Sequence, residues 1–359
     1  MDRGDSIAVF LKLIFDSKDR RFKNLVNRDA WYFDYRVATS YENRNGIYNH
    51  YAFAKRLLSD KNEFVFSFNV PKIDASSLYL FVVIYDDEDV GYIQDIPLQI
   101  LDKKLYSKYL PFDASGIFPE FESFINRRDT VVFFSENNVE LRYCKYNFQP
   151  ALPPMSEMTT GDGEMKLVVD STHIIKSDSL VIFKKKGNYA IGNEGEVPLN
   201  LLVVDYKFPK VSKVKELVDP VIYIATDEER KILRSSAKPK VKLDDFWMDL
   251  GQDKEFARKM IRNYYKKVDL ANKYFSCHKE GWKTDMGMVY IVFGKPDEVF
   301  RNDIKETWNF KKRNNVPALR FIFNKRKGPF GDYYYELENN PDYASIWYEV
   351  VEMWRKGEF

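Results

Sequence analysis

The spacing of apolar side chains changes near residue 208, and this change limits the folds that the chain can adopt. Before that point every second residue of several segments is apolar, as with Phe64, Phe66, Phe68 and Val70. A period of two predicts strands that bury one face. Later the spacing lengthens to three or four residues, as in Asp253–Phe275, which predicts a long amphipathic helix. We therefore expect a β-rich part followed by a helical part.

Turn residues divide the first part into segments of strand length. Asn43–Gly46 and Asp86–Asp89 carry the Asn, Asp and Gly residues that turns favour. Strands are expected at Tyr32–Ser40, Ile47–Leu57, Glu63–Val70, Leu78–Tyr85 and Tyr92–Leu101. This spacing, with an aromatic content of 16%, is typical of an antiparallel β-sandwich, here of immunoglobulin-like type. The segment Ile7–Phe15 fits either a strand or a short helix.

A second strand-rich stretch follows. Asp129–Phe134 and Val139–Tyr146 flank a short polar turn, which predicts a hairpin. Further strands are expected at Met165–Val169, Ser179–Lys184 and Leu199–Tyr206, with Asp170–Lys176 and Gly187–Glu196 as connections.

The last part of the chain alternates between helix and strand patterns. Thr226 and Glu229 form a capping box, so a helix should begin there. Met288–Phe293 is apolar at every position, which predicts a central strand covered on both faces. Further strands are expected at Glu306–Phe310, Leu319–Asn324 and Tyr333–Leu337, with a final helix at Tyr343–Arg355. This mixture predicts an α+β domain.

These patterns predict a multidomain chain. We expect an N-terminal segment at 1–28, a β-sandwich domain at 29–110, a second β-rich domain at 111–215 and the α+β domain at 216–359.

Composition excludes several functions. The 359 residues include 56 basic and 54 acidic ones, and this balance argues against a nucleic-acid partner. No apolar run reaches the 18 residues expected of a membrane-spanning helix. The three histidines lack metal-ligand spacing and no phosphate-binding loop is present, so we expect no metal and no cofactor. Cys144 and Cys277 could be one disulfide or two thiols.

One pentapeptide is more specific than these patterns. Gly281-Trp282-Lys283-Thr284-Asp285 resembles the signature of the GWxTD-domain family, and its surroundings agree with that family. The supporting segments are Phe246-Trp247, Tyr264-Tyr265, Ala271–Phe275, Met288–Val299 and Glu306–Phe310. The resemblance implies a Bacteroidota protein exported to the cell envelope, in the periplasm or at the outer membrane and in some members a lipoprotein, with its signal removed here. A cytoplasmic location is the alternative. The resemblance implies no activity.

The motif residues have two interpretations. In the structural one, Gly281 lets the chain leave a helix at positive φ, Trp282 packs beneath it, and Thr284 and Asp285 bond a turn. In the functional one, Asp285, Asp297 and Glu306 are acceptors of a polar recess walled by Trp282 and Trp308. The full set for this binding or structural motif is Gly281, Trp282, Thr284, Asp285, Gly294, Pro296, Asp297, Glu306 and Trp308. No catalytic residue is assigned.

The function expected from these observations is non-catalytic. We expect a subunit that binds other envelope proteins in an outer-membrane or secretion assembly. One alternative is a hydrolase of glycan or peptide that uses paired acids of the GWxTD region. Another is a carbohydrate-binding module with tryptophan walls. Basic runs at Lys184–Lys186, Lys311–Arg313 and Lys325–Lys327 leave peripheral membrane association open. The family resemblance leaves a lipid anchor open.

Overall fold

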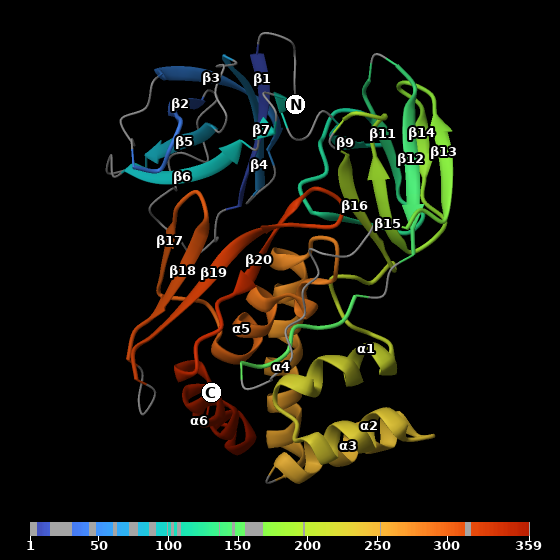
Figure 1. The fold of residues 1–359 in the computed structure, drawn as a ribbon, viewed down its shortest axis with the longest axis vertical. Coiled ribbons are helices and arrows are strands. Elements are labelled where there is room, and N and C mark those ends of the chain that lie inside the picture. Colours follow the sequence, from blue (N-terminus) through green and yellow to red (C-terminus); the bar gives the residue numbers. More distant parts are fainter. Residues whose placement is uncertain are drawn as a thin grey trace.

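Figure 1 shows the computed structural model, in which two β domains lie side by side above a C-terminal domain of helices and one sheet. The structure describes residues 6–14, 31–42, 48–59, 63–71, 78–85, 91–98, 100–101, 104–105, 109–135, 137–145, 148–154, 168–196, 198–251, 253–312 and 317–358. The turns expected at Asn43–Gly46 and Asp86–Asp89 lie outside these residues. The expected order, β-rich first and α+β last, is confirmed.

The first β domain is one antiparallel sheet of six strands, in the order β1-β4-β3-β2-β5-β6, folded over onto itself. The strands are β1 (Ser6–Ile14), β2 (Trp31–Ala38), β3 (Tyr48–Ser59), β4 (Glu63–Pro71), β5 (Leu78–Tyr85) and β6 (Gly91–Leu98). β3 joins the two layers, because its first half pairs with β2 and its last residues pair with β4. Phe66 of β4 and Leu80 of β5 are both buried in the core between the layers.

The second β domain is a sandwich of two sheets, ordered β10-β16-β15-β12-β13 and β14-β11-β9. Its strands are β9 (Pro111–Asp113), β10 (Phe124–Asn126), β11 (Thr130–Phe133), β12 (Val139–Cys144), β13 (Ser171–Ile175), β14 (Leu180–Ile182), β15 (Gly187–Ile191) and β16 (Leu199–Val204). A small ribbon of β7 (Ile100–Leu101) and β8 (Lys104–Leu105) precedes it. Val131 of one sheet and Tyr189 of the other belong to the same buried core.

The C-terminal domain packs helices against a four-stranded sheet, β17-β18-β19-β20. Its helices are α1 (Val214–Val218), the 3-10 turn η4 (Asp219–Tyr223), α2 (Asp227–Ser235), α3 (Pro239–Leu250), α4 (Lys254–Phe275), η5 (Gly281–Lys283), α5 (Asp285–Phe293) and α6 (Asp342–Lys356). Its strands are β17 (Glu298–Arg301), β18 (Lys305–Phe310), β19 (Leu319–Lys327) and β20 (Tyr333–Leu337). α5 lies within the core, with Phe293 against Phe321 of β19 and Trp347 of α6.

Local signals explain where these helices begin and end. Thr226 accepts a hydrogen bond from the Glu229 N–H, as the capping box predicts. Asp253 accepts from the N–H groups of Glu255 and Phe256 and so begins α4. Gly357 ends α6 in the left-handed conformation that glycine favours. Within the described residues, no helix is both long and apolar enough to cross a bilayer.

The expected strand at Met288–Phe293 is wrong, because these residues form most of α5. An apolar run carries no period that separates a doubly covered strand from a helix buried on all sides. Two further signals favour the helix: Thr284 caps it and Gly294 ends it.

Three predictions for the second β domain are also wrong. Gly187–Glu196 was expected to be a connection, yet it contains β15, which lies between β12 and β16. Asp170–Lys176 was expected to be a connection, yet it contains β13. The expected hairpin is absent, since β11 and β12 belong to different sheets of the sandwich. The strand expected at Met165–Val169 lies largely outside the described residues, and Val168 and Val169 are not in a strand.

The C-terminal core predicts the effect of one truncation. Phe321 is fully buried and contacts three aromatic rings, so Phe321→Ala should reduce the free energy of unfolding by about 3–5 kcal/mol. Arg320→Ala, on the exposed face of the same strand, should change it by less than about 0.5 kcal/mol. Urea unfolding measures both; equal effects would contradict this assignment of the two faces.

Candidate functional site

The GWxTD pentapeptide forms a tight corner between α4 and α5. An added Cβ at Gly281 would lie 2.0 Å from the carbonyl oxygen of Ala271, so only glycine fits there. Gly287 is under the same constraint, since its Cβ would lie 1.8 Å from the Gly281 carbonyl oxygen. The expected positive φ at Gly281 is wrong: close backbone approach requires the glycine. The positive-φ helix exit occurs instead at Gly294, where φ is 84°.

Buried hydrogen bonds hold this corner to the end of α4. The Trp282 N–H donates to the side-chain oxygen of Asn272 at 3.1 Å, and the Gly281 N–H donates to the Ser276 hydroxyl at 2.9 Å. The Tyr223 hydroxyl donates to the Trp282 carbonyl oxygen at 2.9 Å. Trp282 is only 6% exposed, so it belongs mainly to the core and leaves little surface for a ligand to stack on.

Thr284 and Asp285 begin α5. The Thr284 hydroxyl donates to the Gly281 carbonyl oxygen at 2.8 Å and accepts from the Gly287 N–H at 3.0 Å. Asp285 occupies the first turn, where the helix dipole favours a negative charge. The motif residues therefore all have structural uses at the corner.

A second turn follows α5 and contains Gly294, Pro296 and Asp297. A carboxylate oxygen of Asp297 accepts a hydrogen bond from the Lys311 N–H at 2.8 Å, which fixes the turn to the end of β18. Asp285 is therefore the first residue of α5, whereas Asp297 lies in the turn after the other end of the helix.

The third acid, Glu306, takes part in a different contact. It is 6% exposed, and its carboxylate accepts from Trp308 Nε1 at 2.7 Å and from Arg301 Nε at 2.7 Å. Arg301 then reaches the first β domain, where its Nη1 donates to Asp95 of β6 at 3.0 Å. The structure thus brings Glu306 and Trp308 together, but it ties them to the first β domain and not to the GWxTD corner.

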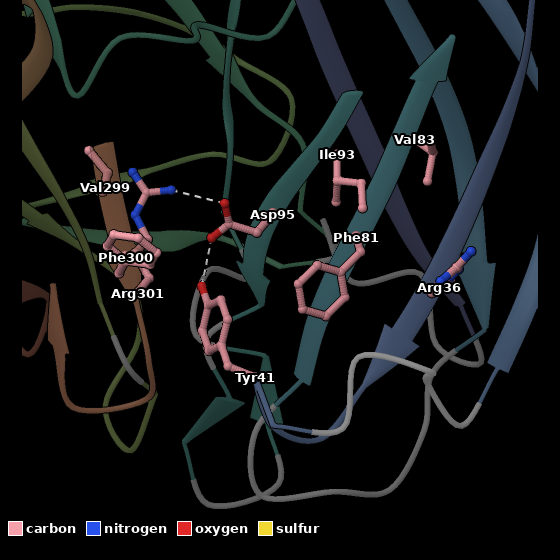
Figure 2. Close-up of a pocket in the computed structure, with 9 residues that line it drawn as sticks. All are labelled: Arg36, Tyr41, Phe81, Val83, Ile93, Asp95, Val299, Phe300 and Arg301. Atoms are coloured by element: carbon pink, nitrogen blue, oxygen red, sulfur yellow. Dashed lines mark hydrogen bonds and ion pairs between the residues drawn. The ribbon is translucent and has the colours of Figure 1, made fainter. Parts of the chain in front are cut away.

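Figure 2 shows the far end of this contact, with Asp95 between the Arg301 guanidinium and the Tyr41 hydroxyl. The Tyr41 hydroxyl donates to Asp95 at 2.7 Å. We call the chain Tyr41–Asp95–Arg301–Glu306–Trp308 the interdomain clasp. It joins residues that are 206 positions apart in the sequence.

A cavity of about 230 Å³ lies beside the clasp. Phe81, Val83 and Ile93 line one side, on the outer face of β5 and β6. Val299 and Phe300 of β17 line the other side. Both β6 and β17 are edge strands of their sheets, so the cavity lies between two sheet edges.

The charges of the clasp stabilise one another. Burial alone would lower the pKa of the Arg301 guanidinium, but the Glu306 carboxylate outweighs burial and raises it. Burial and the hydrogen bond to Asp95 raise the pKa of Tyr41. Burial and the nearby Glu306 raise the pKa of Tyr335 to about 12. Arg301 and both tyrosines therefore stay protonated at neutral pH, which suits a permanent contact and not proton transfer.

Other reactive groups are not assembled into a centre. Cys144 and Cys277 are both free thiols, and burial raises the pKa of the Cys144 thiol to about 11. His278 is buried between the rings of Phe148 and Tyr334. In the part of the chain that the structure describes, no group of three His, Cys, Asp or Glu side chains could hold a metal ion.

The fold is thus an α+β domain with a glycine-dependent corner, preceded by two β domains. The family profile described as the GWxTD domain matches residues 187–356, so this part of the chain is a GWxTD domain. The match begins at β15 and therefore includes two strands of the second β domain. No curated protein and no solved structure matches the chain.

Sequence reasoning did not find Tyr41, Asp95 or Arg301. Asp95 and Arg301 lie on strands whose pairing partners are local, and nothing in either strand predicts that the two edges meet. An Asp among apolar residues of β6 is the one available signal, and it is too common to be specific.

The corner makes a prediction about its first glycine. Gly281→Ala should reduce the free energy of unfolding by about 3 kcal/mol or more, because the methyl group meets the backbone of α4 and no flexible side chain can move aside. Gly91→Ala is the control, since its methyl group meets only side-chain atoms, at 3.1 Å. Thermal unfolding distinguishes them, and similar melting temperatures would contradict the close approach.

The clasp makes a second prediction. Asp95→Ala removes the partner of Arg301 across the domain boundary, while Arg301 keeps Glu306. Amide hydrogen exchange should become about fivefold faster in β6 and β17. This factor corresponds to the loss of about 1 kcal/mol, which is typical of a partly exposed ion pair. Gln94→Ala, at the neighbouring exposed position, should leave exchange in β17 unchanged. Unchanged exchange in both variants would show that the clasp does not hold the domains together.

Proposed function

We propose that this chain is a non-catalytic, protein-binding subunit of an outer-membrane or secretion assembly in the cell envelope. The observation that carries the binding role is an apolar sheet face on the second β domain, outside the GWxTD corner. The envelope location rests on the family resemblance, as does peripheral or lipid-anchored membrane association.

The apolar face belongs to the sheet β14-β11-β9. Phe112, Val132 and Leu180 are neighbours across its three strands, on the side away from the sandwich core. The first β domain already covers part of this face, because the Phe10 ring lies 5.5 Å from the Phe112 ring. On β14 the face continues with Leu180, 61% exposed, and Ile182, 53% exposed. We call Leu180 and Ile182 the β14 face.

An extended strand of a partner protein is the occupant that fits the β14 face. β14 is the edge of its sheet, so one side of its backbone has no strand partner among the described residues. Unpaired backbone groups beside exposed apolar side chains favour addition of a further strand. The face is also continuous with the contact between the two β domains, where apolar burial already occurs.

The first β domain supports a binding role through its topology. Its layers, β1-β4-β3 and β2-β5-β6, correspond to the B-E-D and C-F-G strand orders of immunoglobulin-like sandwiches. Such sandwiches commonly occur in proteins that bind other proteins, and we propose an immunoglobulin-like fold here.

The contacts of the motif residues favour binding over hydrolysis. Paired-carboxylate hydrolysis needs two acids within about 10 Å across a cleft. Asp285 begins α5, and Asp297 lies in the turn after its other end, where it accepts a hydrogen bond from the Lys311 N–H. Glu306 is bound to Arg301 and Trp308. Sugar stacking on Trp282 or Trp308 would need exposed rings, whereas both are buried.

The test is a pull-down of tagged protein from the native host envelope in mild detergent, read by mass spectrometry. The native protein should capture a stoichiometric set of envelope proteins. Leu180→Lys/Ile182→Lys should lose this set, because two charges on an exposed apolar face prevent docking without affecting the core.

Ile232→Lys/Val241→Lys is the matched control. These side chains are 53% and 50% exposed, on α2 and α3, and the same number of charges is added. The control should retain the captured set and both variants should keep the native melting temperature. Capture that does not differ between the two variants, or a native protein that migrates as a lone monomer, would refute the proposal.

A further inference from the structure

A groove of about 630 Å³ lies between the second β domain and the GWxTD corner. Four segments that are distant in sequence form its walls: Arg127 after β10, Lys186 before β15, residues 205–219 around α1, and Trp282 with Lys283 of the corner. Its size is that of a typical ligand pocket. The GWxTD corner thus lines a groove large enough for a ligand. This groove is separate from the cavity beside the interdomain clasp.

The groove is more basic than the chain as a whole. Its cationic residues are Arg127, Lys186, Lys207, Lys210, Lys213, Lys215 and Lys283, and its acidic residues are Asp205, Glu216, Asp219 and Glu280. The whole chain has 56 basic and 54 acidic residues, so overall composition does not account for this excess. A groove with an excess of positive charge attracts ligands of negative charge.

Two acids of the groove, Glu280 and Asp205, show that its cations can bind carboxylates. Glu280 lies between Lys186 at 3.1 Å and Lys283 at 2.8 Å. Burial raises the pKa of Glu280, but the two ammonium groups outweigh burial and hold it at about 2. Asp205 is held in the same way, by Arg127 at 3.4 Å and by Lys213. Carboxylates bridged by two cations are therefore already stable in this groove.

Three further cations remain available. Lys207, Lys210 and Lys215 are exposed and form no ion pair with any residue that the structure describes. Lys207 and Lys210 lie between β16 and α1, and Lys215 lies in α1, so the three lysines are spread over nine residues of the chain. Tyr206, 81% exposed, lies beside them and offers an aromatic surface. This spacing fits several separate negative charges on one extended ligand better than a single compact anion.

We propose that this groove binds an extended acidic segment of a partner protein, whose carboxylates pair with Lys207, Lys210 and Lys215. This inference rests on the proposed protein-binding function for the class of its ligand. It adds a second contact, of charged character, to the apolar contact at the β14 face. The GWxTD corner has a role in this contact, since it positions Trp282 and Lys283 as one wall of the groove.

The test uses purified full-length protein and a fluorescein-labelled hexaglutamate peptide, with binding followed by fluorescence anisotropy at about 50 mM salt. The native protein should bind, and binding should weaken as salt increases. Lys207→Glu/Lys210→Glu/Lys215→Glu should weaken binding about tenfold or more, as the loss of three exposed ion pairs would give. An absence of binding by the native protein would overturn the proposal.

The matched control is Lys231→Glu/Lys254→Glu/Lys259→Glu, which changes the net charge equally at exposed helix positions outside the groove. It should change the affinity less than twofold, with both variants keeping the native melting temperature. Equal losses in the two variants would overturn the groove assignment. Displacement of the peptide by millimolar inorganic phosphate, or tighter binding to phosphatidylglycerol vesicles that depends on the same lysines, would overturn the peptide ligand.

This experiment is independent of the host pull-down. If the peptide binds through the three lysines while no partner is captured, the groove chemistry stands and the assembly role fails. If partners are captured through the β14 face while the peptide does not bind, the groove proposal alone fails.

Discussion

The close approach of two backbone segments at Gly281 is the constraint on which the C-terminal domain depends. With no side chain at this position, the chain passes directly over the Ala271 carbonyl and turns into α5. Asn272 and Ser276, near the end of α4, then bond the corner from one side, and Tyr223 bonds it from another. This turn sets the direction of α5, whose Phe293 packs against Phe321 of β19 and Trp347 of α6. The positions of the sheet and of the last helix therefore depend on the turn.

Where a residue pattern is local and periodic, the structure agrees with it. The expected strands Leu78–Tyr85 and Tyr333–Leu337 have the observed bounds, and the long helix differs from α4 by one residue. The pattern failed where burial is complete on every side, as at α5, since such a run has no period to read. It failed again at β15, whose Gly187 and Asn188 are turn formers by composition. In the structure Gly187 pairs with β16, and Asn188 pairs with both β12 and β16.

The candidate site was found only in part, for a different reason. Glu306 and Trp308, which were expected in one polar recess, do form a buried polar contact. Arg301, Asp95 and Tyr41 were not predicted. Contacts between domains leave no period and no turn signal in the sequence. The groove beside Trp282 was missed likewise, since its cations come from four separate segments.

Charged residues at the joints of this molecule are paired, whereas some of those on its surface are not. Asp95, Glu280 and Glu306 each have at least one cationic partner, and these pairs stabilise joints between domains or between elements. A catalytic carboxylate needs the opposite arrangement, with a free face toward a substrate and a pKa moved toward neutrality. Among the described residues, Lys207, Lys210 and Lys215 of the groove form no ion pair, and Leu180 and Ile182 of β14 are exposed. These acids are paired internally, while cations and apolar side chains of an edge strand face outward, which is the arrangement that the proposed protein-binding role requires.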